Sequence, residues 1–252
     1  MKKLLLFMGV FFLFLGGYSQ SRVTFSENFD GKTHSFTSIP ANAWIVDSTL
    51  SVSGKNSCWG FIPNTEGDTV ILESPLYDLT SYAYAYLRFT HICKVSENDL
   101  VTVEFREDHL SSRWKKLPAN TYRGSSVTYR KRQFFNDMSY DAWMYSDFDA
   151  EPNNSWWKTE NFDVSQEVSY ARVQFRFKIA KGSTIGSQFA YGWLIDNFEL
   201  IASSNEINPP IVELMDPTVE GKVFGTGPYQ IVAKTVKQTP IPLLPPVLYM
   251  TY

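Results

Sequence analysis

The 252-residue sequence has few cysteines, a small net charge and no long apolar run after its first 20 residues. Its two cysteines, Cys58 and Cys93, are too few to replace a hydrophobic core by a framework of disulfides. The 23 Lys and Arg against 26 Asp and Glu give a formal net charge of −3, which argues against a nucleic-acid-binding protein of strongly basic character. Its 14 Gly and 13 Pro together are 27 of 252 residues, a share far below the roughly 25–30% that marks low-complexity chains. We therefore expect a folded protein with its own core and no nucleic-acid partner.

The sequence also lacks the short motifs of common enzymes. It contains no Gly-x-Ser-x-Gly, no His-Glu-x-x-His and no glycine-rich phosphate-binding loop. The most closely spaced thiol and imidazole belong to His91 and Cys93. Because these two residues share a predicted strand face with Leu87 and Phe89, the pattern favours a buried pair over a catalytic dyad. We predict that this chain is not an enzyme.

Residues 1–19 have the pattern of a signal peptide. Two lysines precede an apolar run over residues 4–15, and the tripeptide Gly17-Tyr18-Ser19 has a small residue at each end. The run is shorter than the roughly 20 residues that a membrane-spanning helix needs. We expect cleavage after Ser19 and a protein that is secreted or held at the cell surface, with no membrane span in the mature chain. In an oxidising compartment one disulfide between the two cysteines is chemically allowed, and their spacing does not decide it.

The segment from residue 22 to about 202 predicts short strands separated by turns, without a long amphipathic helix. In residues 101–106 and 172–179, apolar and polar side chains alternate with the period of two that is typical of a strand. Such strands bury one face and expose the other, as strands of an antiparallel sandwich do. The 7 Trp, 14 Tyr and 19 Phe supply large side chains for a core or for a ligand surface. We predict an all-β fold of two stacked antiparallel sheets.

The segment Tyr82–Cys93 also alternates, and its two faces have different characters. One face carries Ala83, Ala85, Leu87, Phe89, His91 and Cys93, and the other carries Tyr82, Tyr84, Tyr86 and Arg88. An exposed row of tyrosines is a platform on which sugar rings can stack, because each ring offers apolar area while its hydroxyl stays wet. The plainer interpretation, which the pattern favours, is β-propensity with ordinary cross-strand packing.

The composition changes after residue 202. Residues 205–210 end in two prolines and suit a linker, so we place the sandwich domain at 20–204. Three further strands are predicted over residues 211–215, 229–236 and 247–252. Since an immunoglobulin-like sandwich needs about 100 residues, residues 211–252 predict only part of such a domain, within a longer extracellular protein.

Six landmarks occur in an order that resembles a known family. The resemblance covers about residues 23–202 and rests on Phe25-Ser-Glu-Asn-Phe-Asp-Gly31, Trp44, Glu73-Ser-Pro-Leu-Tyr-Asp-Leu79, Val101-Thr-Val-Glu104, Trp157 with Phe162-Asp-Val-Ser165, and Gly192-Trp-Leu-Ile-Asp-Asn-Phe198. This order is similar to the MAM-like jelly rolls, and within them to the choice-of-anchor and cleaved-adhesin domains of secreted bacterial proteins. The tail is similar to the first strands of bacterial immunoglobulin-like repeats.

The resemblance implies a two-sheet jelly roll whose first and last strands lie side by side, often pinned by a calcium ion. It points to Glu27 or Asp30 and to Asp196 as ligands, with Asn197 as a further one. Where the family often has two consecutive acids, this sequence has Asp196-Asn197. Calcium needs six to eight oxygen ligands, so backbone carbonyls or water would have to complete the site. The alternative is that Asp30-Gly31 forms a simple turn and that Asp196 is hydrogen-bonded in place.

A second group of acidic residues lies in an aromatic-rich stretch between residues 134 and 157. It lacks the glycine and the final glutamate of an EF-hand loop, so it is a poor metal motif. Aromatic rings mixed with carboxylates do suit a ligand-binding loop, since rings stack on sugars and carboxylates accept hydroxyl hydrogen bonds. The predicted ligand-binding residues are Trp143, Tyr145, Asp147 and Asp149. The alternative for the tryptophans of this stretch is packing in the core.

The basic residues Arg123, Arg130, Lys131 and Arg132 form a cluster that we expect to cap a solvated strand edge. With these features the sequence predicts a secreted or cell-surface binding module, adhesive by resemblance, that recognises an extracellular glycan or a protein surface. Two other interpretations remain open. One is an accessory domain of a secreted hydrolase, a protease or a glycosidase, whose catalytic domain lies outside this chain, and the other is a structural spacer.

Overall fold

The computed structural model describes residues 22–31, 33–109, 111–143, 151–183 and 190–205, and the backbone of three strands over 211–214, 230–236 and 247–251. The predicted signal peptide, 1–19, and most of the predicted linker lie outside these residues. Within them, no helix is both long enough and apolar enough to cross a membrane.

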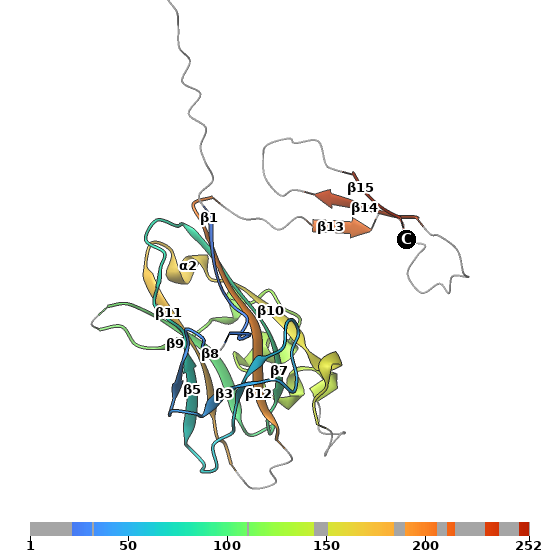
Figure 1. Cartoon of the computed structure of the whole chain (residues 1–252). Helices are drawn as coiled ribbons and strands as arrows, with labels where there is room; N and C mark the ends of the chain where they lie inside the picture. Colours follow the sequence, from blue (N-terminus) through green and yellow to red (C-terminus); the bar gives the residue numbers. More distant parts are fainter. Residues whose placement is uncertain are drawn as a thin grey trace, which may run out of the picture.

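Two antiparallel sheets stack face to face, which confirms the predicted all-β two-sheet sandwich (Figure 1). Sheet A has the order β10 (Lys158–Asp163), β7 (Tyr84–Lys94), β12 (Gly192–Ser203), β4 (Ser57–Gly60) and β3 (Trp44–Asp47), with β1 (Arg22–Glu27) also paired to β12. Sheet B has the order β2 (Thr37–Ile39), β5 (Thr69–Glu73), β11 (Arg172–Ala180), β8 (Leu100–Glu107) and β9 (Lys115–Lys116), with β6 (Tyr77–Asp78) also paired to β11.

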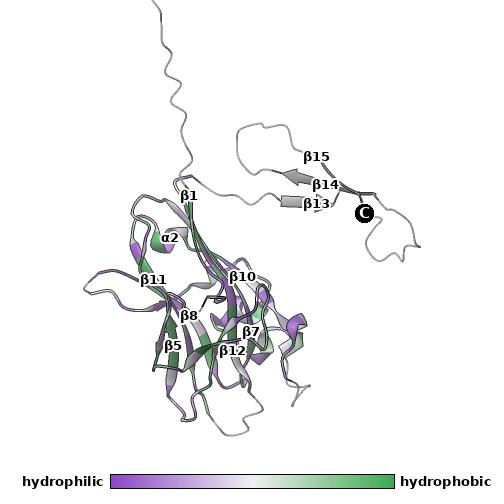
Figure 2. Ribbon diagram, viewed as in Figure 1, coloured by the Kyte–Doolittle hydropathy of each residue, from purple (hydrophilic) through white to green (hydrophobic). Residues whose placement is uncertain are grey.

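The core lies between the sheets, and the predicted alternation places its residues. In β11 every second side chain, from Val173 to Ile179, is fully buried. The ring of Phe177 lies 5.0 Å from that of Phe89 and 5.3 Å from that of Trp193, so it joins the two sheets. Burying one such side chain contributes about 1.5–3 kcal/mol to folding. In Figure 2 hydrophobic and hydrophilic segments both occur along the strands, as expected where buried and exposed side chains alternate.

The first and last strands of the sandwich lie side by side, as the family resemblance implied. Strand β1 pairs antiparallel with β12 from Arg22↔Ser203 to Glu27↔Phe198. A β-bulge in β12 lies between Asp196 and Glu199, and Asn197 within it has a φ of 49°. Asn tolerates this left-handed backbone better than most residues do. The bulge therefore re-aims the side chains of Asp196 and Asn197 at the point where β1 ends.

A long connection between β9 and β10 closes one side of the sandwich. Its described helical turns are η1 (Ala119–Thr121), α1 (Val127–Arg132), η2 (Asp137–Ser139), η3 (Asp141–Trp143) and η5 (Asn154–Trp156). Helix α1 begins after Ser126, whose side chain accepts a hydrogen bond from the Tyr129 N–H, and ends at Gln133 in the left-handed conformation. Arg130, Lys131 and Arg132, which we expected to cap a strand edge, are not part of a strand themselves but form the last turn of α1.

The three predicted C-terminal strands are present as β13 (Ile211–Leu214), β14 (Gln230–Val236) and β15 (Val247–Thr251), which form an antiparallel sheet with β14 in the middle. An immunoglobulin-like domain stays a prediction for this part of the chain. Cys58 and Cys93 are both buried free thiols, so the structure contains no disulfide between them.

Candidate functional site

Trp143, one of the predicted ligand contacts, lies in the core. Its side chain is fully buried, its Nε1–H donates to the carbonyl of Trp156 at 2.9 Å, and its ring lies edge-on to His91 at 5.0 Å. A ring in this position cannot stack on a ligand, so the alternative of packing in the core holds for Trp143. The other predicted contacts, Tyr145, Asp147 and Asp149, lie outside the described residues.

A buried carboxylate anchors the long connection to sheet A. Glu160 of β10 is fully buried and accepts hydrogen bonds from the hydroxyls of Tyr122, at 2.5 Å, and Tyr140, at 2.6 Å. The Nδ1 atom of His91 accepts from the Trp193 Nε1–H, so the proton of the neutral ring is on Nε2, which donates to Glu160 at 3.1 Å. Burial lowers the pKa of His91, which favours this neutral form. The network fixes Tyr122, and hence the residue that follows it, beside β10.

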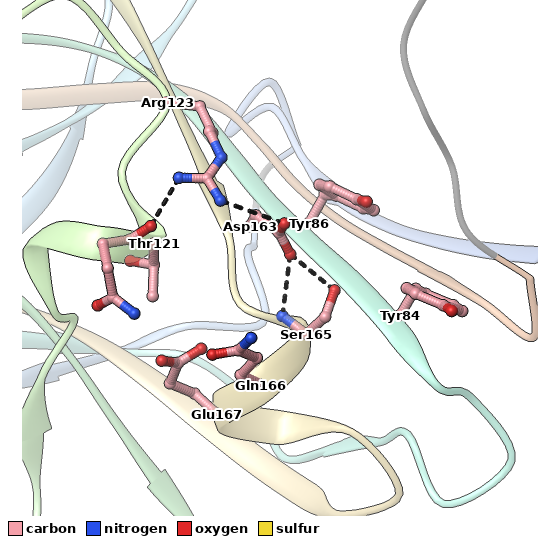
Figure 3. A pocket seen from close by; sticks show the side chains of 9 residues that line it. Tyr84, Tyr86, Thr121, Arg123, Asp163, Ser165, Gln166 and Glu167 are labelled. Atoms are coloured by element: carbon pink, nitrogen blue, oxygen red, sulfur yellow. Dashed lines mark hydrogen bonds and ion pairs between the residues drawn. The ribbon is translucent and has the colours of Figure 1, made fainter. Parts of the chain in front are cut away.

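A polar pocket of about 410 Å³ lies next to this anchor, on the outer face of sheet A (Figure 3). Tyr84 and Tyr86 project from the same side of β7, which is the face that the alternation of residues 82–93 predicted for them. The tyrosine pocket, as we name it, is lined by Tyr84, Tyr86, Asn120, Thr121, Arg123, Asp163, Ser165, Gln166 and Glu167. No cysteine or histidine is among these lining residues.

A chain of hydrogen bonds positions the polar wall of the tyrosine pocket. The Arg123 N–H donates to the Asn161 carbonyl at 2.7 Å, and its guanidinium lies 3.4 Å from Asp163 Oδ2. Asp163 Oδ1 in turn accepts from the Ser165 hydroxyl at 2.7 Å. Ser165 begins helix α2 (Ser165–Val168), and the Ala85 N–H donates to its hydroxyl at 3.1 Å. Three elements that are distant in the sequence are therefore tied together around one hollow.

Glu167 on α2 supplies a carboxylate whose hydrogen-bonding capacity is only partly used. Its Oε2 atom is shielded from solvent and has no hydrogen-bond partner within the described residues. Burial raises the pKa of Glu167, and the nearby charge of Asp163 raises it further, while Arg123 opposes the shift. An under-satisfied acceptor of this kind costs free energy, which a donor such as a hydroxyl can recover by moving into the pocket.

Three of the four predicted calcium ligands, Asp30, Asp196 and Asn197, contact one loop, residues 50–56. Asp30 Oδ1 accepts from the N–H groups of Lys55, at 2.6 Å, and Asn56, at 3.0 Å. Gly54 has a φ of +66°, and a Cβ at this position would lie 1.6 Å from Asp30 Oδ2, so only glycine lets the loop approach so closely. Asp196 Oδ2 accepts from the Val52 N–H at 2.8 Å. The structure thus brings Asp30 and Asp196 to the same loop.

The fit of calcium to these residues is incomplete. Burial raises the pKa of Asp196, and the charge of Asp30 adds to the shift, so the two carboxylates repel each other where a cation would relieve them. Glu27, however, turns both oxygens to backbone N–H groups, those of Phe29 and Ser35. The described residues contain no cluster of three or more acidic, histidine or cysteine side chains that suits a metal ion. Calcium stays a prediction.

Sequence reasoning missed Arg123 and Glu167 as pocket residues and assigned Asp163 only to a family landmark. Arg123 was read with the basic cluster, although its own partner is an acid 40 positions later. The one local signal was Asp163-Val164-Ser165-Gln166-Glu167, in which an acid, a hydroxyl and a second acid are spaced to begin a helical turn.

Comparisons with known proteins give a distant structural likeness. No family model matches the chain, and no curated protein matches it. The K1 cleaved adhesin domain of Lys-gingipain from Porphyromonas gingivalis W83 is similar over 71% of this chain and 97% of that domain, with 13% identity and a TM-score of 0.39. The K2 cleaved adhesin domain of Lys-gingipain is similar over 71% of this chain and 99% of that domain, with 13% identity and a TM-score of 0.37. TmCBM61, solved in complex with β-1,4-galactotriose, is similar over 70% of this chain and 86% of that chain, with 11% identity and a TM-score of 0.30.

Proposed function

We propose that this chain is a non-catalytic carbohydrate-binding module of an extracellular protein, and that the tyrosine pocket is its binding site. The observation that carries the proposal is the pairing of two outward tyrosine rings with a polar wall at one hollow. Sugar rings have an apolar face and a rim of hydroxyls, and this pocket offers a counterpart to each.

The polar wall suits hydroxyl groups in particular. Arg123 and Gln166 are exposed donors, while Asp163 and Glu167 are acceptors. A hydroxyl both donates and accepts, so it can use both kinds of group at once.

The test is a comparison of two tyrosine variants in the full chain. Tyr86→Ala removes a pocket ring, whereas Tyr170→Ala removes a ring that is 65% exposed and does not line the pocket. After a glycan array has identified an oligosaccharide that binds, calorimetry should show a loss of about tenfold in affinity for Tyr86→Ala, equivalent to about 1.4 kcal/mol. Tyr170→Ala should bind as the wild type does. Equal affinities for all three proteins would refute the assignment of the pocket.

A protein surface is the second candidate ligand, and an accessory role beside a catalytic domain is the second candidate context. An array that stays blank for all sugars, combined with capture of an extracellular protein that Tyr86→Ala fails to capture, would favour the protein ligand. The accessory role is tested by the reaction of the whole gene product: hydrolysis by it, with none by residues 20–204 alone, would favour that context.

Calcium is tested by thermal unfolding of the full chain with calcium and with an excess of chelator. If Asp30 and Asp196 hold the ion, chelation lowers the melting temperature, because a ligand at 100 times its Kd stabilises by about 2.7 kcal/mol. The Asp196→Ala variant should unfold at the same temperature in both buffers. Identical wild-type curves would retire the calcium proposal.

A further inference from the structure

Positive charge is concentrated in one stretch of this acidic protein. Residues 109–136 contain no Asp or Glu, although the whole sequence has 26 of them. The same stretch carries seven Lys and Arg, which are Arg113, Lys115, Lys116, Arg123, Arg130, Lys131 and Arg132. Charge asymmetry of this kind within a chain of net charge −3 points to a surface with an electrostatic partner of its own.

The fold holds residues 117 and 135 of this stretch at one edge of sheet B. The Leu117 N–H donates to the Val103 carbonyl at 3.0 Å, and the Phe135 N–H donates to the Val101 carbonyl at 2.8 Å. Val101 and Val103 are neighbours on the same edge of β8, about 7 Å apart along the strand. The chain thus leaves the edge of β8 and returns to it within two strand positions. Strand β9 pairs with β8, and the Tyr129 hydroxyl of α1 donates to the Leu117 carbonyl at 3.0 Å, so the basic last turn of α1 lies in the same part of the molecule as Lys115 and Lys116.

Among the described residues, most of these cations have no acidic partner. Arg123 pairs with Asp163, but within the described ranges no ion pair involves any of the other six. Arg130 donates to the Gly124 carbonyl at 2.7 Å, and the Lys115 ammonium lies 5.9 Å from the ring of Phe105. We call the six the basic edge: Arg113, Lys115, Lys116, Arg130, Lys131 and Arg132, all of them exposed.

The hairpin between β8 and β9 adds shape to this charge. Two adjoining hollows of about 410 and 300 Å³ share Glu107, His109 and Ser112 in their walls, and Arg113 and Lys115 line the larger one. Beside them, Asp108 is engaged by Arg172 at 2.8 Å, so its charge is already compensated. The surface is thus indented where Arg113 and Lys115 lie, and Glu107 contributes one carboxylate to the walls of both hollows.

We propose that the basic edge binds an acidic polysaccharide, one that carries sulfate or carboxylate groups along its chain. Cations spread along an edge match anions spread along a polymer, and the attraction needs no enclosed pocket. Nucleic acid fits less well, because single strands are bound by stacking on exposed aromatic rings. Three rings beside these cations are engaged or buried: Trp114 packs on Arg106 and Arg176, and Phe105 and Tyr129 are buried. This binding is separate from that of the tyrosine pocket and goes beyond it.

The alternative is purely structural. Lysines on the edge strand β9 would prevent pairing with another sheet, and the cations of α1 would complement the negative end of the helix dipole. These two roles predict no ligand, whereas the proposal predicts an affinity that falls with salt, because the polymer releases counterions when it binds.

The experiment measures binding of the full chain to dextran sulfate and to uncharged dextran of the same length, at about 50 mM and about 200 mM NaCl. We expect binding to dextran sulfate alone, with a strong loss at the higher salt. The variant with Lys115→Gln and Lys116→Gln should bind about five- to tenfold more weakly, and so should the variant with Lys131→Gln and Arg132→Gln.

The matched control carries Arg22→Gln and Lys55→Gln, two exposed cations outside the basic edge, and it should lose less than about twofold. An equal loss in this control would overturn the proposal, and so would absence of wild-type binding at low salt. Single-stranded DNA of equal charge bound as tightly as dextran sulfate would overturn the choice of polysaccharide. Tyr86→Ala should keep the binding, which separates this result from that for the tyrosine pocket.

Discussion

On the outer face of sheet B, charged side chains of neighbouring strands neutralise one another, whereas on the outer face of sheet A polar groups remain open to solvent. Glu104 of β8 accepts hydrogen bonds from both Arg176 and Lys178 of β11. On sheet A the pair Arg88–Glu199 spans 3.7 Å, and the two side chains are 53% and 36% exposed. A charge that is already paired and covered has little left to offer a ligand. At Glu104 the comparison is in keeping with the small-ligand site that we propose on sheet A, although the pair Arg172–Asp108 of sheet B is as exposed as Arg88–Glu199.

Trp114 makes the difference between the faces larger. Its ring lies 4.6 Å from the guanidinium of Arg106 and 4.3 Å from that of Arg176, so it covers the charged rows of sheet B. No tryptophan lines the tyrosine pocket of sheet A, where the rings of Tyr84 and Tyr86 form one wall of a hollow. An aromatic side chain thus covers charged groups on sheet B, whereas aromatic side chains on sheet A line a pocket that is open to a ligand.

The largest effect should come from breaking the charge network of sheet B. Glu104→Gln leaves two cations without their shared anion at a site where Glu104 is only 4% exposed, so we expect a loss of about 2–3 kcal/mol in the free energy of unfolding. Glu199→Gln removes the same charge from sheet A and should cost less than about 1 kcal/mol. Urea titration of both variants gives the two numbers. Equal losses would mean that the faces do not differ in this way.

A second pair of variants separates stability from binding. Trp114→Ala loses two cation–π contacts and should destabilise the protein by about 1–2 kcal/mol without changing its affinity for the oligosaccharide. Tyr84→Ala should do the reverse, with a change in stability below about 1 kcal/mol and a clear loss of affinity. Denaturation and calorimetry on the same samples test both statements. If Trp114→Ala weakened oligosaccharide binding, the ligand would have to contact sheet B.

The inner faces of both sheets were predictable, because a strand side chain either points into the core or out of it. In residues 172–179 the apolar set is the buried set, whereas in residues 101–106 the polar Thr102 and Glu104 are buried together with the apolar residues. Pairing of β1 with β12 followed from the family resemblance, not from periodicity. Trp143 escaped prediction because it lies in a short 3₁₀ turn, where no alternating pattern tells a buried ring from an exposed one.

The tyrosine pocket was only half predictable. Tyr84 and Tyr86 belong to one strand, so their common face could be derived from the sequence alone. Arg123 reaches Asp163 only because the preceding residue, Tyr122, pairs with Phe162 across 40 positions. Such a pairing depends on how the long connection packs against Glu160, and a local pattern contains no information about that packing.

The smallest effect concerns the pH dependence of stability. As the pH rises, Glu104 of sheet B should increase the free energy of unfolding, and Glu167 beside sheet A should decrease it. Burial alone would raise the pKa of Glu104, but hydrogen bonds and charges from Lys178 and Arg176 hold it below its ordinary value of 4.5. Its stabilising contribution is therefore complete above pH 4.5 and is lost as the pH falls through the lower, folded-state pKa. Burial, with the charge of Asp163, raises the pKa of Glu167 above 4.5, so its contribution is complete below pH 4.5 and is lost as the pH rises.

Urea midpoints measured between about pH 3 and pH 7 can resolve these opposite signs. In Glu104→Gln the urea midpoint should fall less steeply than in the wild type as the pH drops below 4.5. Near pH 7 the variant should be less stable than the wild type. The wild type should lose stability above pH 4.5 as Glu167 ionises, and the Glu167→Gln variant should not. The stability of the variant relative to the wild type should therefore increase as the pH rises. If both variants shifted the profile in the same direction, Glu167 would be compensated as fully as Glu104 is. The acceptor that we assign to a sugar hydroxyl would then be occupied within the protein itself.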